Sequence, residues 1–320
     1  MRTVVLAFGG NAFVGEGESG AYREQLATIQ RMARVVVDLR ERGYRVVITH
    51  GNGPQVGALA IQQEEGAGLV PPQPLFVLGA MTAGQLGHLL GLAIRGLVDR
   101  ATSVTCLITH AVVDANDPAF QEPTKPIGPF FERDEAERLA RERDWTVHEV
   151  EHSQHRRVVA SPAPIEVLET GSIRTLLNEE TLVIAGGGGG VPVVRCEGPR
   201  LEGVEVVIDK DPVARLLASV LGAELLILVT GVPAVAVNFD TADERWLQEV
   251  TVDEAEKLQQ EGQFPAGSMG PKVESAVEFL HDGGELAIIT SDEFVLAAVD
   301  GQHGTRIVPN GAAHDREGGA

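Results

Sequence analysis

The chain alternates between short, wholly apolar runs and longer segments whose apolar residues recur at helical spacing. Residues 4–8 form a continuous apolar run that ends at Gly9, which is typical of a strand buried on both faces. From 22 to 42 the apolar residues recur every three or four positions, and Gly43 stands where a left-handed C-terminal cap is expected. The same pattern predicts strands at 46–48, 104–108, 182–185, 225–229, 286–289 and 305–308, and helices from Pro54 and over 82–100.

This alternation predicts an α/β fold, with an open, mostly parallel sheet that carries helices on both faces. Capping chemistry predicts two helix starts: Asp211 as N-cap before Pro212, and Thr251 with Glu254 as a capping box. Residues 114–164 interrupt the rhythm with six of the seventeen prolines and a charged, helix-like stretch at 132–143. We interpret them as a small protruding subdomain inserted into a single domain of residues 1–320. The tail, 309–320, is expected to fray.

Composition narrows the class of protein. A chain of 320 residues with 43% hydrophobic content can bury a large core. Its net charge of −20 opposes binding to nucleic acid and to anionic lipid. It has neither a continuous apolar stretch of membrane-spanning length nor a signal peptide, so we expect a cytoplasmic protein. Cys106 and Cys196 are too few for a disulfide framework, and we expect both to be buried.

Three glycine-rich segments follow predicted strand ends, at 9–11, 50–55 and 186–190. Ligands of an open parallel sheet bind beyond the carboxyl ends of its strands, so these segments should gather at one edge. Glycines allow backbone N–H groups to converge on phosphate oxygens, and a helix that starts at Pro54 would add its N-terminal amides. Any one of these segments is as easily a simple tight turn, but three together favour an anion site.

The common nucleotide motifs are incomplete. The chain has no G-x-x-x-x-G-K-[ST] segment and is therefore not a P-loop enzyme. Gly51, Gly53 and Gly57 approach the dinucleotide pattern, which leaves an NAD-dependent dehydrogenase as an alternative. The acidic residue that this pattern requires would fall near Pro71 and Pro72, where no strand is expected.

Three lysines stand out in this acidic chain, because an anion site must gather its own positive charge. Lys125 lies in a proline-rich segment, and Lys210 and Lys272 lie at predicted helix starts. A lysine is usually only a solvated surface charge, so it is the setting of these three that makes them candidates.

Seven segments along the chain form a set of motifs: 9–12 (GGNA), 49–57 (THGNGPQVG), 79–82 (GAMT), 125–129 (KPIGP), 186–193 (GGGGGVPV), 207–211 (VIDKD) and 265–272 (PAGSMGPK). Together they resemble the motifs of carbamate kinases, a branch of the amino acid kinase family, in the same order across nearly the whole chain. The resemblance implies a three-layer αβα fold with Lys125 on the protruding subdomain, a homodimer, and reversible phosphoryl transfer between MgATP and carbamate to give carbamoyl phosphate and ADP.

The resemblance also implies roles for residues. The catalytic set is Lys125, Lys210, Asp211 and Lys272, and the substrate-binding set is Gly9, Gly10, Asn11, Gly51, Asn52, Gly53, Gly187 and Gly188. The nucleotide-binding set is Asp209, Lys210, Thr230, Gly231, Asn238, Met269, Gly270 and Lys272. Mg²⁺ would be held through the ATP phosphates, with no protein ligand assigned.

Phosphoryl-transfer chemistry agrees with this assignment, because catalysis depends on in-line positioning and on cationic stabilisation of a metaphosphate-like group. Carbamate is already an anion, so no general base is required. The chain departs from the family pattern at Ser153, Gln154, His155, Ala83, His88 and Phe76. These departures keep open a related kinase for another small carboxylate or phosphonate. A nucleotide-binding regulator without turnover is the non-enzyme alternative.

Overall fold

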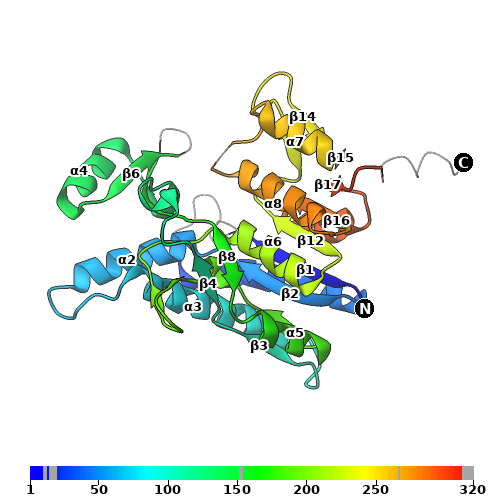
Figure 1. Ribbon diagram of the computed structural model, residues 1–320, viewed down its shortest axis with the longest axis horizontal. Coiled ribbons are helices and arrows are strands. Elements are labelled where there is room, and N and C mark those ends of the chain that lie inside the picture. Colours follow the sequence, from blue (N-terminus) through cyan, green and yellow to red (C-terminus); the bar gives the residue numbers. More distant parts are fainter. Residues whose placement is uncertain (10–12, 14–19, 151–153, 266, 312–320) are drawn as a thin grey trace, which may run out of the picture.

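The computed structural model describes residues 1–9, 13, 20–150, 154–265 and 267–311. Its centre is an eight-stranded sheet in the order β15-β17-β16-β12-β1-β2-β9-β3 (Figure 1). The strands are β1 Thr3–Phe8, β2 Arg45–His50, β3 Val104–Cys106, β9 Leu182–Ile184, β12 Leu225–Val229, β15 Glu249–Thr251, β16 Leu286–Thr290 and β17 Thr305–Val308. Every pairing is parallel except that of β16 with β17. The open, mostly parallel sheet predicted from the sequence is therefore confirmed.

Alternate residues of each central strand enter different cores, because successive side chains of a strand point to opposite faces. Val5 and Ala7 of β1 belong to one core, and Val4, Leu6 and Phe8 belong to the other. Because both faces are apolar, both must be covered. This explains why the predicted strands are continuous apolar runs.

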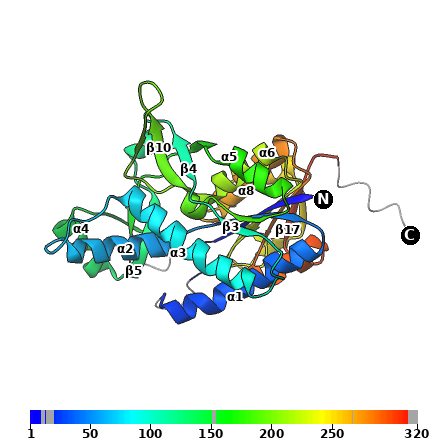
Figure 2. The ribbon, with the colours of Figure 1, turned by 90° about the horizontal axis from the view of Figure 1, so that it is seen from below.

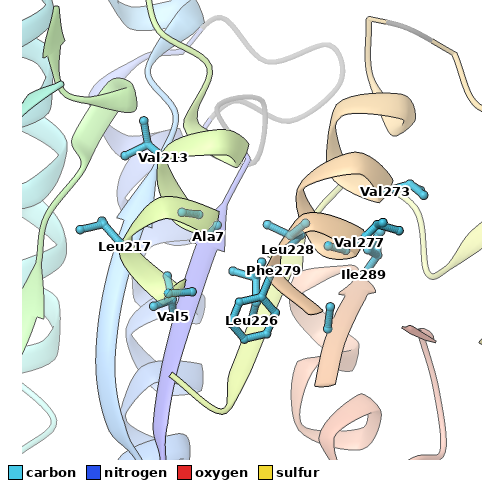
Figure 3. Packing of buried hydrophobic residues seen from close by; sticks show 14 of the residues in the cluster. Val5, Ala7, Val213, Leu217, Leu226, Leu228, Val273, Val277, Phe279 and Ile289 are labelled. Atoms are coloured by element: carbon cyan, nitrogen blue, oxygen red, sulfur yellow. The ribbon is translucent and has the colours of Figure 1, made fainter. Parts of the chain in front are cut away.

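Helices cover each face of the sheet. The core that contains Leu6 packs against α1 Tyr22–Glu41, α3 Leu75–Arg95 and α9 Val295–Val299. The core that contains Val5 packs against α5 Thr170–Asn178, α6 Lys210–Leu221, α7 Val252–Gln260 and α8 Met269–His281. Figure 3 shows Val213 and Leu217 of α6 and Phe279 of α8 packed over β1 and β12. Leu86, Ile29 and Phe279 are among the fully buried side chains of these layers.

Two smaller sheets lie beside the main one. A four-stranded sheet has the order β11-β10-β4-β8, formed by β4 His110–Val113, β8 Pro164–Val167, β10 Val191–Arg195 and β11 Leu201–Gly203. Between β4 and β8 the chain passes through the short helix η2 Pro118–Phe120 and then forms a three-stranded sheet, β5-β7-β6, with α4. These elements are β5 Lys125–Phe131, α4 Arg133–Arg143, β6 Thr146–Glu149 and β7 His155–Val159.

The elements between β4 and β8 lie at one end of the molecule together with α2 Gly53–Gly66, as both views show (Figures 1 and 2). We use the term subdomain for β5, α4, β6 and β7. The hairpin of β13 Val235–Val237 and β14 Arg245–Leu247 lies at the opposite end, near α7.

Several local predictions from the sequence are corrected. The N-cap of α6 is Asp209, whose side chain accepts from the backbone N–H of Asp211, so Asp211 lies in the first turn. Helix α3 begins at Leu75 rather than at 82 and ends at Arg95. Cys106 is exposed and Cys196 is half-buried. The capping box of Thr251 and Glu254 is confirmed, and the predicted fraying of the tail concerns residues that, from 312 onward, lie outside the described part of the chain.

Helix α3 is the one helix in the described part of the chain that is long and apolar enough to cross a membrane by length and composition. It packs against α1 and β3, and Leu86, Leu90 and Ile94 are buried in the sheet core. The core helices of soluble proteins pass the same test.

The subdomain approaches α2 through two glycines that face each other. A methyl carbon built on Gly57 of α2 would lie 2.0 Å from the backbone nitrogen of Gly128 in β5. Gly128 itself has a φ of 74°, a left-handed conformation that glycine adopts without strain. Near the start of α2, a methyl carbon on Gly53 would lie 3.3 Å from the carbonyl oxygen of Pro126. The strand that carries Lys125 is therefore packed directly on the backbone of α2.

This contact predicts the effect of Gly57→Ala. The added methyl group meets backbone rather than a movable side chain, so we expect the free energy of unfolding to fall by about 1–3 kcal/mol and the subdomain to shift away from α2. Denaturant unfolding measures the stability. Gly66→Ala on the same helix is the matched control, because a methyl carbon there has no heavy atom within 4 Å. Equal stabilities for the two variants would contradict the contact.

Candidate active site

The ends of β1 and β2 meet at one edge of the central sheet. Gly9 directly follows β1, and the backbone N–H of Gly51 donates to the carbonyl oxygen of Phe8 at 3.0 Å. This bond holds the loop 51–53 beside the end of β1. Gly10 and Asn11 were predicted to bind substrate here and lie outside the described residues.

The third glycine-rich segment is packed against the second. Gly186, Gly188, Gly189 and Gly190 have φ values between 65° and 82°. A methyl carbon on Gly188 would lie 2.2 Å from Nδ2 of Asn52, so only a bare backbone fits beside that amide. The glycines of this run therefore allow the backbone to approach its neighbours where a side chain would collide.

Buried hydroxyl groups fix the positions of these loops. Thr82 of α3 accepts from Asn52 Nδ2 at 2.8 Å and donates to the carbonyl oxygen of Leu78 at 2.9 Å. Thr49 donates to the carbonyl oxygen of Gly186 at 2.8 Å, and Thr109 accepts from the backbone N–H of Gly186 at 3.0 Å. The loops 51–53 and 186–190 are thus held rigidly, as an anion site built from backbone requires.

His50 lies fully buried beneath these loops. Its Nδ1 lies 3.1 Å from the carbonyl oxygen of Gly51, and because a carbonyl oxygen only accepts, Nδ1 carries the proton. Nε2 is then an acceptor, and it has no partner among the described residues. Burial lowers the pKa of His50 from 6.5 to about 4, against a smaller opposing effect of the Gly51 hydrogen bond, so the ring is neutral.

Three ammonium groups gather around two carboxylates beside the glycine run. Lys125 of the subdomain donates to Asp209 Oδ2, and Lys210 donates to Asp211 Oδ1. Lys272 of α8 donates to Asp211 Oδ2 at 3.1 Å. The predicted lysines, which are widely separated in the sequence, therefore lie together and carry one positive charge in excess of their carboxylate partners.

The charged cluster is contiguous with the glycine loops. A methyl carbon on Gly189 would lie 2.5 Å from the carbonyl oxygen of Ile208, the residue before Asp209. The side chains of Lys210 and Asp211 are only 7% and 4% exposed, which means that both charges are largely removed from water. Such burial is costly unless each charge has a partner.

The pKa values in this cluster reflect a balance between burial and ion pairing. Burial raises the pKa of Asp211, but Lys210 and Lys272 together lower it by more, so the net shift of this pKa is downward. The pKa of Asp209 is also lowered, because Lys125 and Lys210 outweigh the effect of burial. Burial lowers the pKa of Lys210, whereas Asp211 and Asp209 raise the pKa of Lys272 despite its burial.

The predicted nucleotide-binding residues lie on the side of α8 and β12. Thr230 follows β12, and its backbone N–H donates to Thr290 at the end of β16 at 2.8 Å. Asn238 has a φ of 52°, and its backbone N–H donates to Oε1 of Gln263 at 2.8 Å, which ties the loop after Gly231 to the segment before α8. Met269 and Gly270 form the first turn of α8, two to three residues before Lys272. The described residues provide no direct contact between Asn238 and the lysines.

The residues at which the chain departs from the family pattern lie in different settings. Ala83 is buried against the glycine run, where a methyl carbon on Gly187 would lie 3.0 Å from its Cβ. Phe76 packs against Gly203 of β11, and His88 is exposed on α3. Ser153 lies outside the described residues, and His155 is buried.

Two buried side chains of the site were missed from the sequence. His50 and Gln55 lie in the segment 49–57, whose glycines alone carry the sequence-based prediction of a site. Neither Oε1 nor Nε2 of the buried Gln55 has a partner among the described residues. The sequence offers one signal for them: His50 is a polar residue at the end of an apolar strand, and Gln55 is a polar residue in the first turn of a helix.

Two cavities lie away from these residues. One, of about 200 Å³, is lined by Pro233, Trp246 and His303, and the other lies between α1 and α9 near Arg34 and Asp292. We assign the site to the sheet edge instead, because three lysines meet bare glycine backbone there.

The described residues contain no group of three or more His, Cys, Asp or Glu side chains that could hold a metal ion. Asp209 and Asp211 are both occupied by lysines. This arrangement fits a metal that arrives with a phosphate ligand better than one held in a protein cage.

The arrangement defines a class of protein: an α/β fold in which lysines and bare glycine backbone gather at one edge of a mostly parallel sheet. The chain belongs to the amino acid kinase family, whose model matches residues 2–291. Carbamate kinase of Thermococcus kodakarensis is 45% identical over 96% of this chain and 99% of its own length. Carbamate kinase of Giardia lamblia bound to citric acid has a TM-score of 0.92 and 38% identity, with 97% of this chain and 99% of that chain covered.

A second solved structure of the Giardia lamblia enzyme, bound to AMP-PNP, has a TM-score of 0.87 and 39% identity over 97% of this chain and 99% of that chain. These relatives and the family match identify the chain as an enzyme, a kinase that transfers phosphoryl groups.

The buried His50 predicts a pH dependence of stability. The unfolded chain binds a proton near pH 6.5, whereas the folded protein does so only near pH 4, so the free energy of unfolding should fall as the pH decreases between these values. The expected loss from this one group is about 3 kcal/mol. Denaturant unfolding at a series of pH values measures it.

The variant His50→Gln should flatten this part of the pH profile, because glutamine does not titrate. The exposed His88 supplies the control, and His88→Gln should leave the profile as in the parent protein. An unchanged slope in His50→Gln would mean that His50 is not the group responsible.

Proposed function

We propose that this enzyme transfers a phosphoryl group reversibly between ATP and carbamate, giving carbamoyl phosphate and ADP. The observation that carries the proposal is the cluster of Lys125, Lys210 and Lys272, which has an excess of positive charge beside a glycine-lined loop in a chain of net charge −20. Full-length similarity to carbamate kinases supports carbamate as the acid.

The proposed mechanism uses charge rather than a general base. Carbamate offers a carboxylate oxygen that attacks the γ-phosphorus of ATP in line, while the bond to the bridging oxygen of ADP breaks. The proposed carbamate-binding residues are Gly9, Gly10, Asn11, Gly51, Asn52, Gly53, Gly187 and Gly188. The backbone N–H groups of Asn52, Gly53, Gly187 and Gly188 are the donors of this set proposed to bind the carbamate end. Asn52, held by Thr82, orients this part of the site.

The lysines stabilise the charge that develops on the transferring group. Lys125 leaves Asp209 and reaches the equatorial oxygens from the subdomain side, and Lys210 and Lys272 act from the opposite side while Asp211 keeps both oriented. A neutral His50 beneath the loop adds no competing charge.

ATP is the proposed phosphoryl donor, and its proposed binding residues are Asp209, Lys210, Thr230, Gly231, Asn238, Met269, Gly270 and Lys272. The pairing of Asp209 and Asp211 with the lysines supports Mg²⁺ held by the phosphates themselves. When bound, Mg²⁺ neutralises phosphate charge.

We further propose a cytoplasmic homodimer. Support comes from apolar side chains that remain exposed on and near α3: Met81, Leu92 and Ile108 are 47%, 55% and 41% exposed. Exposed apolar side chains of this size are consistent with association with another chain. The measurement is the molar mass in solution, and a monomer at micromolar concentration would count against the dimer.

The alternatives fit less well. A dinucleotide enzyme would need an acidic residue at the tip of the next strand, whereas Pro71 and Pro72 lie in the connection between α2 and α3. A regulator without turnover would have no need for three lysines and Asp211 in one cluster. A kinase for another acid remains the outcome to be tested directly.

A substrate panel separates these functions. Purified enzyme is supplied with MgATP and, in parallel, ammonia plus bicarbonate, acetate, glutamate or a small phosphonate, and ADP formation is followed. We expect turnover with ammonia plus bicarbonate and, in the reverse direction, ATP formation from ADP and carbamoyl phosphate. Turnover with another acid alone would reassign the substrate, and binding of AMP-PNP without turnover would favour the regulator.

The lysine cluster gives a second prediction. Lys125→Ala and Lys272→Ala should each lower kcat by about 10²-fold or more, because each removes a cation that faces the transition state. Initial rates of ADP formation measure the loss. Lys257→Ala, whose side chain is 75% exposed on α7, is the matched control and should retain parental activity. Near-parental activity in Lys125→Ala would overturn its assignment.

A further inference from the structure

Glu64, near the C-terminal end of α2, binds this helix to the subdomain. Three donors of the subdomain converge on this one carboxylate: Nη1 of Arg157 at 2.9 Å, Nη1 of Arg143 at 3.1 Å and Nε1 of Trp145 at 3.2 Å. Arg143 ends α4, Trp145 precedes β6 and Arg157 lies in β7. Glu64 therefore connects α2 to α4, to β7 and to the connection between α4 and β6.

The cluster is partly buried and depends on its carboxylate. The guanidinium groups of Arg143 and Arg157 lie 5.3 and 4.9 Å from the ring centroid of Trp145. The side chains of Arg143, Arg157 and Glu64 are 24%, 23% and 32% exposed. Two cations beside one aromatic ring repel each other, and Glu64 offsets this repulsion because it pairs with both. Glu65 pairs only with Arg143 and is 65% exposed.

A short path leads from this cluster to Lys125. In the antiparallel pairing of β5 with β7, Arg157 faces Ile127 and Val159 faces Lys125. The backbone N–H of Thr124 also donates to the carbonyl oxygen of Val159 at 3.1 Å. Arg157 is thus two residues along β7 from Val159, the partner of Lys125. If β7 is held at Arg157, the pairing of β7 with β5 also holds the position of Lys125.

The other end of α2 lies in the candidate active site. The helix begins directly after Asn52, and its Gly53 and Gly57 contact the backbone of Pro126 and Gly128 on either side of Ile127. Helix α2 therefore contacts the subdomain at two places. Near loop 51–53 it contacts β5, the strand of Lys125, and at Glu64 it binds the subdomain a second time. At 1.5 Å per residue, Glu64 lies about 16 Å along the helix from Gly53.

We propose that Glu64 is a positioning residue for Lys125. Through Arg157 and β7 it sets the position of the Lys125 ammonium group relative to loop 51–53. The inference rests on the proposed phosphotransferase function. A direct electrostatic effect of Glu64 on the reaction is small, because about 16 Å exceeds the Debye length of about 8 Å at physiological salt. Its effect must therefore pass through the position of the subdomain.

The test uses the full-length enzyme with Glu64→Ala, and with Glu64→Gln as a variant that keeps the side-chain volume. Initial rates of ATP formation from ADP and carbamoyl phosphate give kcat, and titration with AMP-PNP gives the nucleotide Kd. We expect kcat to fall by about tenfold in Glu64→Ala, since misplaced catalytic groups cost about that much or more, with Kd within about twofold of the parental value. Glu65→Ala, which removes one exposed pair, should keep its kcat.

A double-mutant cycle distinguishes positioning from a general loss of structure. In a Lys125→Ala background Glu64→Ala should cause no further loss of kcat, because the group it positions is absent. An equal fold-loss in both backgrounds, or a kcat of Glu64→Ala within about twofold of the parental value, would overturn the proposal.

A measurement that does not depend on substrate identity separates this proposal from the proposed function. Hydrogen exchange of the backbone amides in β5 and β7 should be faster in Glu64→Ala than in the parental protein and in Glu65→Ala, with unchanged exchange in β1 and β12. Unchanged exchange in β5 and β7 would overturn the positioning role. Absence of carbamate turnover in the parental enzyme would instead overturn the proposed function.

Discussion

The arrangement of this site depends on one electrostatic constraint, which is that positive charge must be concentrated locally in a strongly acidic protein. Lys210 and Lys272 share Asp211, and Lys125 takes Asp209, so three cations are held by two anions. Full neutralisation would leave nothing for an anionic ligand, and no neutralisation would make the buried ammonium groups too costly. In the proposed mechanism, the glycine loops supply the rest of the attraction through backbone N–H groups, which carry no net charge and need no counterion.

The fold could be predicted from the sequence because both cores leave a periodic signal. The apolar runs of β1 and β12 and the helical spacing in α1 define their elements without tertiary information. The start of α6 could not be fixed in this way, because Asp209 and Asp211 are both good caps and Pro212 favours the wrong one. The four-stranded sheet was also missed, since β4 and β11 are too short to show alternation.

The members of the candidate site could be selected from the sequence, but their contacts could not. Lys125, Lys210 and Lys272 were chosen by motif, and their convergence on Asp209 and Asp211 required tertiary coordinates. His50 and Gln55 went unnoticed, because a buried polar residue within a glycine-rich motif is recognised only when its surroundings are known. The role of Glu64 had no local signal at all, since its partners lie 79 to 93 residues away.

Asp209 divides its two oxygens between two tasks. Oδ1 accepts from the backbone N–H of Asp211 and caps the N-terminus of α6, and Oδ2 accepts from Lys125. In the proposed mechanism, Lys125 can therefore leave Asp209 for an incoming ligand while α6 keeps its N-cap, and it can pair with Asp209 again once product leaves. One carboxylate would then serve both the helix and the resting position of the lysine, so that each proposed catalytic cycle begins from the same geometry.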